Sequence, residues 1–349
     1  MKKIQNIQAL RGVAVLSVVL FHLMTIEKKY GGTKTFLPDF FYFGMFGVDL
    51  FFVISGFVMV VVTRGKFQNT KQAIRFLYHR ASRIYPTYWV YSTLVLGVFL
   101  INHSLVNNSQ GNQVDVLASF LLLPSETLPL VIVGWTLIHE MYFYLVFFLV
   151  LLIIPEKRFF SAMLLWGAVI ICMNISLVLI NPFAKLAFHS LNVEFILGCF
   201  IAILFYRMNN QILKTNLLLA IAFVGFIASV YGYDLYQYST GHIAPQGWWR
   251  ILIFGMPALL VVFCFINAER NGFVIHSSLI KIGDASYSIY LSHLLTLHTA
   301  EWIWSTFSSD SVYDNYIVIP ALFILVIIVG MVSYRYVEKP LLTYSRRVA

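Results

Sequence analysis

Charge is what this 349-residue sequence has least of. Asp, Glu, Lys and Arg make up only 11% of it, against about 25% in ordinary soluble domains. Acidic residues number 15, and cysteine occurs three times, as Cys172, Cys199 and Cys264. The shortage of charge excludes a soluble globular protein. Because each cysteine lies in an apolar run, where a thiol acts as a small hydrophobic side chain, we expect neither a disulfide framework nor a metal site.

Apolar residues dominate the rest of the chain, at 60%, with a mean hydropathy of +0.80. A membrane-spanning helix needs roughly 20 mostly apolar residues, so we predict an all-α polytopic membrane protein with about ten transmembrane helices. The apolar runs place these spans at residues 7–26, 42–63, 86–102, 130–154, 159–180, 190–206, 216–233, 251–267, 285–305 and 315–334. A further apolar piece, Val116 to Leu123, is too short to cross and is expected to lie against the membrane or re-enter it.

Lys and Arg are distributed unevenly between the predicted loops. With the N-terminus inside, the inner segments hold 18 of them and the outer segments 5. Cytoplasmic loops carry an excess of positive charge, so this bias predicts that both termini are cytoplasmic. The bias also accounts for the net charge of +9, because positive loops orient the chain in the lipid bilayer. We therefore expect no nucleic-acid partner. No repeat or long linker interrupts the chain, and we expect a single integral-membrane domain over residues 1–349.

Ionisable side chains inside the apolar spans are candidates for function, because a hydrocarbon core tolerates them only where they face a bundle interior or a polar path. There are nine of them: Arg11, His22, Asp49, His139, Glu140, Glu194, His293, His298 and Glu301.

Three of these residues can occur at one depth: His22, Asp49 and Glu140. His22 lies eleven residues after Arg11, which on a helix is nearly the same face, about 16 Å along the axis. Asp49 and Glu140 each lie about eight to ten residues into a span that enters from outside. A carboxylate beside an imidazole fixes its tautomer, as a general base requires. The alternatives are a neutral core histidine and carboxylates that pair structurally with other polar groups.

Two further patterns have two interpretations each. Arg80 and Arg83 share a helical face just before Pro86, the residue at which a span is expected to begin. They either anchor the topology on the inner side or bind a polyphosphate through their guanidinium groups. The outer loop 231–250 is rich in Tyr and Trp, which is typical of a membrane interface and would also suit stacking on sugar rings.

Six motifs in chain order then suggest a family. They are Arg11 with His22, the GVDLFFVISGF segment at 47–57, Arg80 with Arg83, Trp135 to Glu140 with Tyr142 and Tyr144, the GDASYSIYLSH segment at 283–293, and Tyr336 to Pro340. In these motifs the chain resembles the acyltransferase-3 family of bacterial membrane O-acyltransferases, and the resemblance runs from end to end. It resembles the stand-alone form, without a fused periplasmic hydrolase-like domain.

The resemblance implies an enzyme of the bacterial inner membrane that moves an acyl group, usually acetyl, from cytoplasmic acyl-CoA to a hydroxyl of a glycan. Acetyl-CoA would be the donor substrate, with no bound cofactor. Arg80 and Arg83 would hold the CoA phosphates with help from Arg11. His22 would act as general base or as a covalent acyl relay. Asp49 and Glu140 join His22 as catalytic candidates, and the other candidates that match are Trp135, Tyr142, Tyr287, His293 and Glu338.

Other functions stay open from the sequence. A glycan or lipid transporter or flippase would line its path with such polar residues, although no paired halves of the kind common in transporters are visible. A scaffold subunit among envelope-polymer assembly proteins is the third interpretation, but it leaves the spacing of Arg11 and His22 and the arginine pair without a role. Partners of that assembly class would be needed for any second transfer step.

Overall fold

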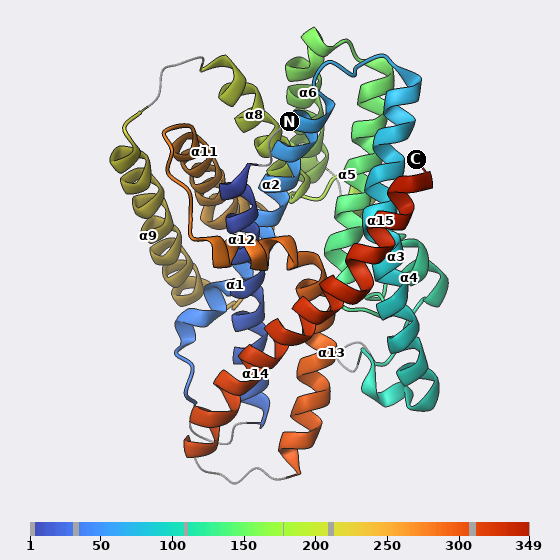
Figure 1. Ribbon diagram of the computed structural model, residues 1–349, viewed down its shortest axis with the longest axis vertical. Coiled ribbons are helices and arrows are strands. Elements are labelled where there is room, and N and C mark those ends of the chain that lie inside the picture. The colour runs from blue at the N-terminus through green and yellow to red at the C-terminus, as the bar shows by residue number, and fades with distance from the viewer. Residues whose placement is uncertain are drawn as a thin grey trace. The chain divides into compact units, whose positions relative to one another are not determined.

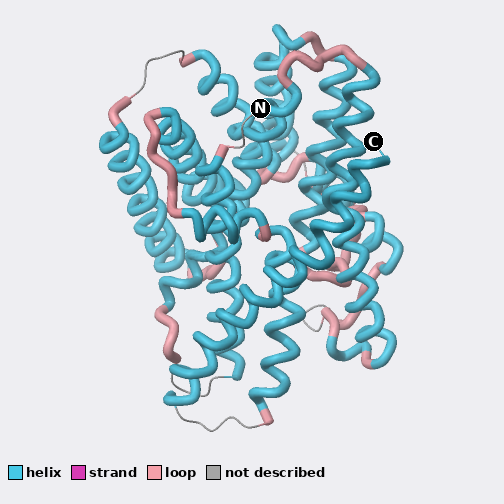
Figure 2. The backbone as a smooth tube through the Cα atoms, in the orientation of Figure 1, coloured by secondary structure: helices cyan, strands magenta, loops and turns pink. Residues whose placement is uncertain are grey.

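The computed structural model describes residues 4–30, 35–107, 111–176, 178–208, 213–306 and 312–348. Within these ranges the regular structure is helical and contains no strand (Figure 2). The all-α class is therefore confirmed. In chain order the elements are α1 (Gln5–Tyr30), η1 (Asp39–Met45), α2 (Phe46–Thr63), α3 (Thr70–Ile101), η2 (His103–Leu105), α4 (Val116–Leu121), α5 (Gly134–Ile153), η4 (Glu156–Arg158), α6 (Phe159–Ser176), α7 (Pro182–Ala187), α8 (Asn192–Arg207), α9 (Thr215–Thr240), α10 (Gly247–Arg250), η5 (Ile251–Gly255), α11 (Met256–Arg270), α12 (Ser277–Asp284), α13 (Ser286–Ser305), α14 (Val312–Ser333), η6 (Tyr334–Glu338) and α15 (Lys339–Val348).

Nine stretches of the described residues are long and apolar enough to cross a membrane, and each overlaps one of the ten predicted spans. The remaining predicted span, 285–305, is present as the 20-residue helix α13. Three ionisable residues interrupt its apolar character, His293, His298 and Glu301. The chain is a multi-pass membrane protein.

The helix that contains the third predicted span begins earlier than expected. Helix α3 does not begin at Pro86 but at Thr70, where the Asn69 side chain accepts a hydrogen bond from the Gln72 N–H at 3.0 Å. Proline has no N–H and disfavours helical geometry in the residue before it, which is why the sequence suggested a boundary there. In membrane helices an interior proline is tolerated, because neighbouring groups satisfy the freed carbonyl. Arg80 and Arg83 therefore lie within a continuous helix rather than in a loop.

The chain divides into two compact units. The first comprises residues 1–54 and 208–336, and the second comprises residues 55–207 and 337–349. The single domain over residues 1–349 stays a prediction.

In the first unit, helix α1 packs closely against α12, which lies across it (Figure 1). A Cβ atom on Gly12 would meet the carbonyl oxygen of Leu279, and one on Gly283 would meet that of Gln8. Such small residues let membrane helices approach at backbone distance. Asn6 also ties α1 to α11 and to the segment before α12, since its side-chain amide donates to the carbonyl oxygens of Phe265 and Phe273 at 2.9 Å each. Helix α1, which carries Arg11 and His22, is therefore firmly held.

In the second unit, the short helix α4 lies against α3. The Tyr85 and Tyr88 hydroxyls and the Trp89 indole N–H on α3 donate to carbonyl oxygens of residues 119–121, each at 2.9 Å. Helix α4 has six residues, so the prediction that this apolar piece does not cross the membrane is confirmed.

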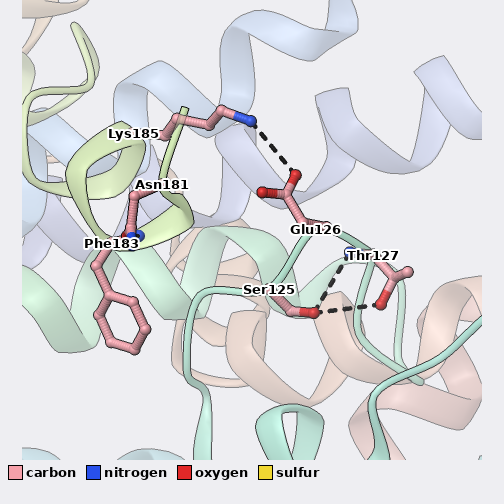
Figure 3. Close-up of polar contacts among 6 residues, drawn as sticks. All are labelled: Ser125, Glu126, Thr127, Asn181, Phe183 and Lys185. Carbon is pink, nitrogen blue, oxygen red and sulfur yellow. Dashed lines mark hydrogen bonds and ion pairs between the residues drawn. The ribbon is translucent and has the colours of Figure 1, made fainter. Parts of the chain in front are cut away.

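The segment after α4 also contacts α7 in the second unit. Lys185 forms an ion pair with Glu126 at 3.3 Å, and Asn181 begins α7 by accepting from the Phe183 N–H at 2.8 Å (Figure 3). Deeper in the unit, the Phe143 ring of α5 stacks on the Phe195 ring of α8 at 4.3 Å between centroids. This ring contact packs α5, which carries Glu140, against α8.

Candidate functional site

The first unit brings together two of the predicted residues, His22 and His293. His22 lies on α1, and its Nδ1 is 2.9 Å from the Val18 carbonyl oxygen and 3.2 Å from His293 Nε2. His293 lies on α13 and is fully buried, with its Nδ1 2.6 Å from the Tyr290 carbonyl oxygen. His22 itself is half-buried. The two rings form a hydrogen-bonded imidazole pair between α1 and α13, and the two histidines are 271 residues apart in the sequence.

Asp49 has a different partner from the one expected. It is fully buried, and both of its carboxylate oxygens are bound by Arg250, at 2.7 Å from Nε and 2.9 Å from Nη2. Two parallel N–H···O bonds of this kind are the strong, oriented form of an arginine–carboxylate pair. The geometry favours the structural interpretation of Asp49 over the catalytic one. Sequence reasoning counted Arg250 only as an outer-loop charge.

Arg11 lies on the same helix as His22. It is half-buried, and its Nη1 is 3.4 Å from the Gln8 side-chain oxygen one turn earlier. Its long apolar stem allows the guanidinium to reach beyond the helix on which it lies. Its role toward the CoA phosphates stays a prediction.

The second unit gathers another set of polar side chains around Glu140. The Tyr144 hydroxyl, one turn along α5, donates to Glu140, and the Ser55 hydroxyl donates to it at 3.2 Å. Sequence reasoning quoted Tyr144 and Ser55 only as parts of motifs and gave neither a role. The spacing of Glu140 and Tyr144, four residues on one helix, could have indicated that the two side chains meet.

Arg80 lies beside this cluster. Its guanidinium carbon is 5.9 Å from the Tyr144 ring centroid and 5.8 Å from that of Phe76, within the range of cation–π attraction. Its Nε is buried and has no hydrogen-bond partner among the residues that the structure describes. A buried N–H donor left without an acceptor costs about 1–3 kcal/mol of folding free energy. An anionic ligand that supplied an acceptor to Arg80 Nε would remove this cost. Arg83, one turn further along α3, is half-buried.

The remaining candidates have varied surroundings. The Trp135 ring is 6.0 Å from that of His139, and the Tyr142 hydroxyl donates to the Ala187 carbonyl oxygen at 3.4 Å. Tyr287 and Glu338 are both buried. Across the described ranges, no three His, Cys, Asp or Glu side chains are grouped so that they could hold a metal ion. The two polar clusters around His22 and Glu140 therefore remain the strongest candidates for chemistry.

Comparisons with known proteins identify the family of the chain. The family model described as an acyltransferase domain, that of the acyltransferase-3 family, matches residues 4–335. The exopolysaccharide production protein ExoZ of Rhizobium meliloti (strain 1021) is 29% identical over 88% of this chain and 92% of its own length.

More distant relatives carry similar names. A protein of Staphylococcus aureus (strain COL), named as a candidate O-acetyltransferase, is 24% identical over 97% of this chain, which spans only 57% of that relative. A candidate acetyltransferase of Acidianus two-tailed virus is 25% identical over 83% of this chain and 82% of its own length. No solved structure matches the chain. On the match over residues 4–335, the chain belongs to the acyltransferase-3 family and is a membrane acyltransferase.

Proposed function

We propose that the protein is a membrane O-acetyltransferase of the bacterial cell membrane. It transfers an acetyl group from cytoplasmic acetyl-CoA to a hydroxyl of a cell-surface polysaccharide. The observation that carries this proposal is the family match over nearly the whole chain, which includes a half-buried His22 with a hydrogen-bonded ring. The name of ExoZ, an exopolysaccharide production protein, supports a polysaccharide acceptor. An acyltransferase family favours an enzyme over a transporter or a scaffold.

Arg80 supports binding of the donor. Coenzyme A carries phosphates, whose oxygens match the fork of an arginine side chain. The Arg80 Nε is buried without a partner among the described residues, and an arriving phosphate would supply that acceptor. The charge bias of the loops predicts that the adjoining end of α3 faces the cytoplasm, where acetyl-CoA is found.

His22 performs the chemical step in this proposal. As a general base it takes the proton of the acceptor hydroxyl while the oxygen attacks the thioester carbonyl carbon. The C–O bond forms, the C–S bond breaks, and the CoA thiolate leaves and takes up a proton. In the alternative route His22 first accepts the acetyl group on a ring nitrogen and then passes it to the hydroxyl. Both routes need an unprotonated ring nitrogen.

Transfer of a labelled acetyl group from acetyl-CoA tests the proposed function. The assay does not depend on which hydroxyl of the polysaccharide is the acceptor. Inverted membrane vesicles from cells expressing the protein receive radiolabelled acetyl-CoA, and the alkali-labile label in the polysaccharide fraction is counted. We expect His22→Ala to remove this label at matched expression, while His103→Ala, which changes an exposed histidine in η2, retains it. Wild-type labelling by His22→Ala would refute the assignment.

The two chemical routes are separated by stopping the reaction before an acceptor is added. Purified protein is mixed with acetyl-CoA alone, quenched and digested, and the peptide that contains His22 is examined by mass spectrometry. An acetylated His22 supports the relay, and its persistent absence supports the general base.

A further inference from the structure

The hydrogen bonds of His22 and His293 determine which ring nitrogens carry protons. A backbone carbonyl oxygen can only accept a hydrogen bond. The Nδ1 of His293 is 2.6 Å from the Tyr290 carbonyl oxygen, and the Nδ1 of His22 is 2.9 Å from that of Val18. Each Nδ1 must therefore be protonated, because a bare nitrogen at these distances would place lone pair against lone pair.

The contact between the two rings then has only one direction. His22 Nδ1 is 3.2 Å from His293 Nε2. Since His22 Nδ1 already carries a hydrogen, His293 Nε2 must accept it, which requires the His293 ring to be neutral with its Nε2 bare. The His22 N–H is shared between the Val18 oxygen and His293 Nε2. The other nitrogen of His22, Nε2, is left without a proton in the neutral ring.

We propose that His293 is a positioning residue that holds His22 in its Nδ1-protonated tautomer, so that His22 Nε2 is the nitrogen that reacts. This inference rests on the proposed function for its consequence, but the tautomers follow from the geometry alone. A neutral imidazole in water has no fixed orientation. In enzymes that activate a nucleophile, the nucleophile contacts a base, and a third group commonly orients that base. His293 takes the place of that third group here.

The surroundings of His293 suit a positioning role. The residue is fully buried, and α13 is held against α14, since a Cβ atom on Gly330 would meet the side chain of Ile289. A carboxylate in place of His293 would stabilise a charged His22 in the resting state. A neutral acceptor fixes the tautomer while leaving His22 uncharged, and it still stabilises the imidazolium that forms when His22 Nε2 takes a proton.

Nitrogen chemical shifts test the tautomers directly. The full-length protein, labelled at its histidine nitrogens, is placed in lipid nanodiscs, and the His22 and His293 signals are assigned by their loss in His22→Asn and His293→Gln. We expect protonated Nδ1 and bare Nε2 on both rings of the wild-type protein. A proton on Nε2 of either ring would overturn the inference.

Activity of two His293 variants tests the consequence. In the vesicle assay, His293→Leu should lower kcat by about tenfold or more and leave KM for acetyl-CoA within about twofold, because only the reacting nitrogen is disturbed. His293→Gln places an amide oxygen where Nε2 accepts and should recover kcat to within about threefold of wild type. Thr299→Val, an exposed change on the same helix, is the control.

The outcomes separate this inference from the proposed function. If His22→Ala is inactive while His293→Leu has wild-type kcat, or if His293→Gln is as impaired as His293→Leu, the positioning role is wrong and the acetyltransferase stands. If His22→Ala is fully active, the proposed function fails, while the nitrogen shifts still decide the tautomers.

Discussion

The candidate residues of the first unit and Arg80 of the second unit differ in their partners. In the first unit, Asp49 is bound by Arg250 through two hydrogen bonds, and His22 and His293 bind each other. In the second unit Arg80 is bordered by aromatic rings and keeps a buried Nε without a partner among the described residues. In our proposal the first unit holds the base in place, and Arg80 of the second unit binds an anion.

The largest expected effect comes from removing the proposed base, His22, while keeping its hydrogen bond. His22→Asn retains an N–H donor near the position of Nδ1 but lacks the second ring nitrogen. We expect the rate of acetyl transfer at saturating acetyl-CoA to fall about 10²- to 10⁴-fold, the usual contribution of general acid–base catalysis. Single-turnover rates in vesicles measure it. A rate within about threefold of wild type would show that the first unit does not supply the base.

Breaking the ion pair of the first unit should affect stability. Asp49→Leu leaves the Arg250 guanidinium, whose side chain is 14% exposed, without its carboxylate, and removing one partner of a buried pair costs about 3–5 kcal/mol. Unfolding in mixed detergent micelles, followed by circular dichroism, measures the loss.

The double variant Asp49→Leu/Arg250→Met is the matched control for that change. It removes both charges, and such replacements are often neutral, so we expect most of the stability to return. If the double variant were as unstable as Asp49→Leu, the loss would come from packing rather than from the unpaired charge.

Changing Arg80, the residue that we propose to bind the donor, should affect donor binding rather than stability. Arg80→Lys keeps the charge but loses the fork that matches phosphate oxygens. We expect KM for acetyl-CoA to rise about tenfold, since a hydrogen bond to a charged group contributes about 1.5–3 kcal/mol, with kcat little changed. Arg75→Lys, at an exposed position earlier on α3, should leave KM at the wild-type value. Equal effects of the two changes on KM would show that Arg80 acts only as a positive charge that orients the protein in the membrane.

The smallest effect is expected at the C-terminal helix of the second unit. The Tyr78 hydroxyl of α3 donates to the Ser345 carbonyl oxygen of α15 at 3.0 Å. Tyr78→Phe removes a bond that contributes about 1 kcal/mol, which corresponds to roughly a fivefold increase in local opening. Trypsin cleavage after Arg346 and Arg347 measures it, with the exposed Tyr344→Phe as control. Unchanged cleavage would show that other contacts hold α15.

The sequence predicted the spans and the unusual residues, because both depend on local composition. A run of about 20 apolar residues indicates a membrane helix, and an ionisable side chain within it indicates a buried polar contact. His22, Asp49, Glu140 and His293 were found in this way, and each takes part in a polar contact in the structure.

The partners of these residues could not be predicted, because they come from distant segments. His22 meets His293 across 271 residues, and Asp49 meets Arg250 across 201. Which helices become neighbours depends on the packing of whole helices, including close approaches such as that of Gly283 to Gln8. The start of α3 was missed for a local reason, because a proline usually marks a boundary and Pro86 lies inside the helix.

The separate roles of His22 and Arg80 are tested most directly by calorimetric titration of acetyl-CoA into purified His22→Ala and Arg80→Ala proteins, side by side with wild type. We expect His22→Ala to bind acetyl-CoA as tightly as wild type although it transfers nothing, and Arg80→Ala to bind it at least about tenfold more weakly. Loss of binding in His22→Ala together with wild-type binding in Arg80→Ala would contradict the assignment of the base to the first unit and of the donor site to the second.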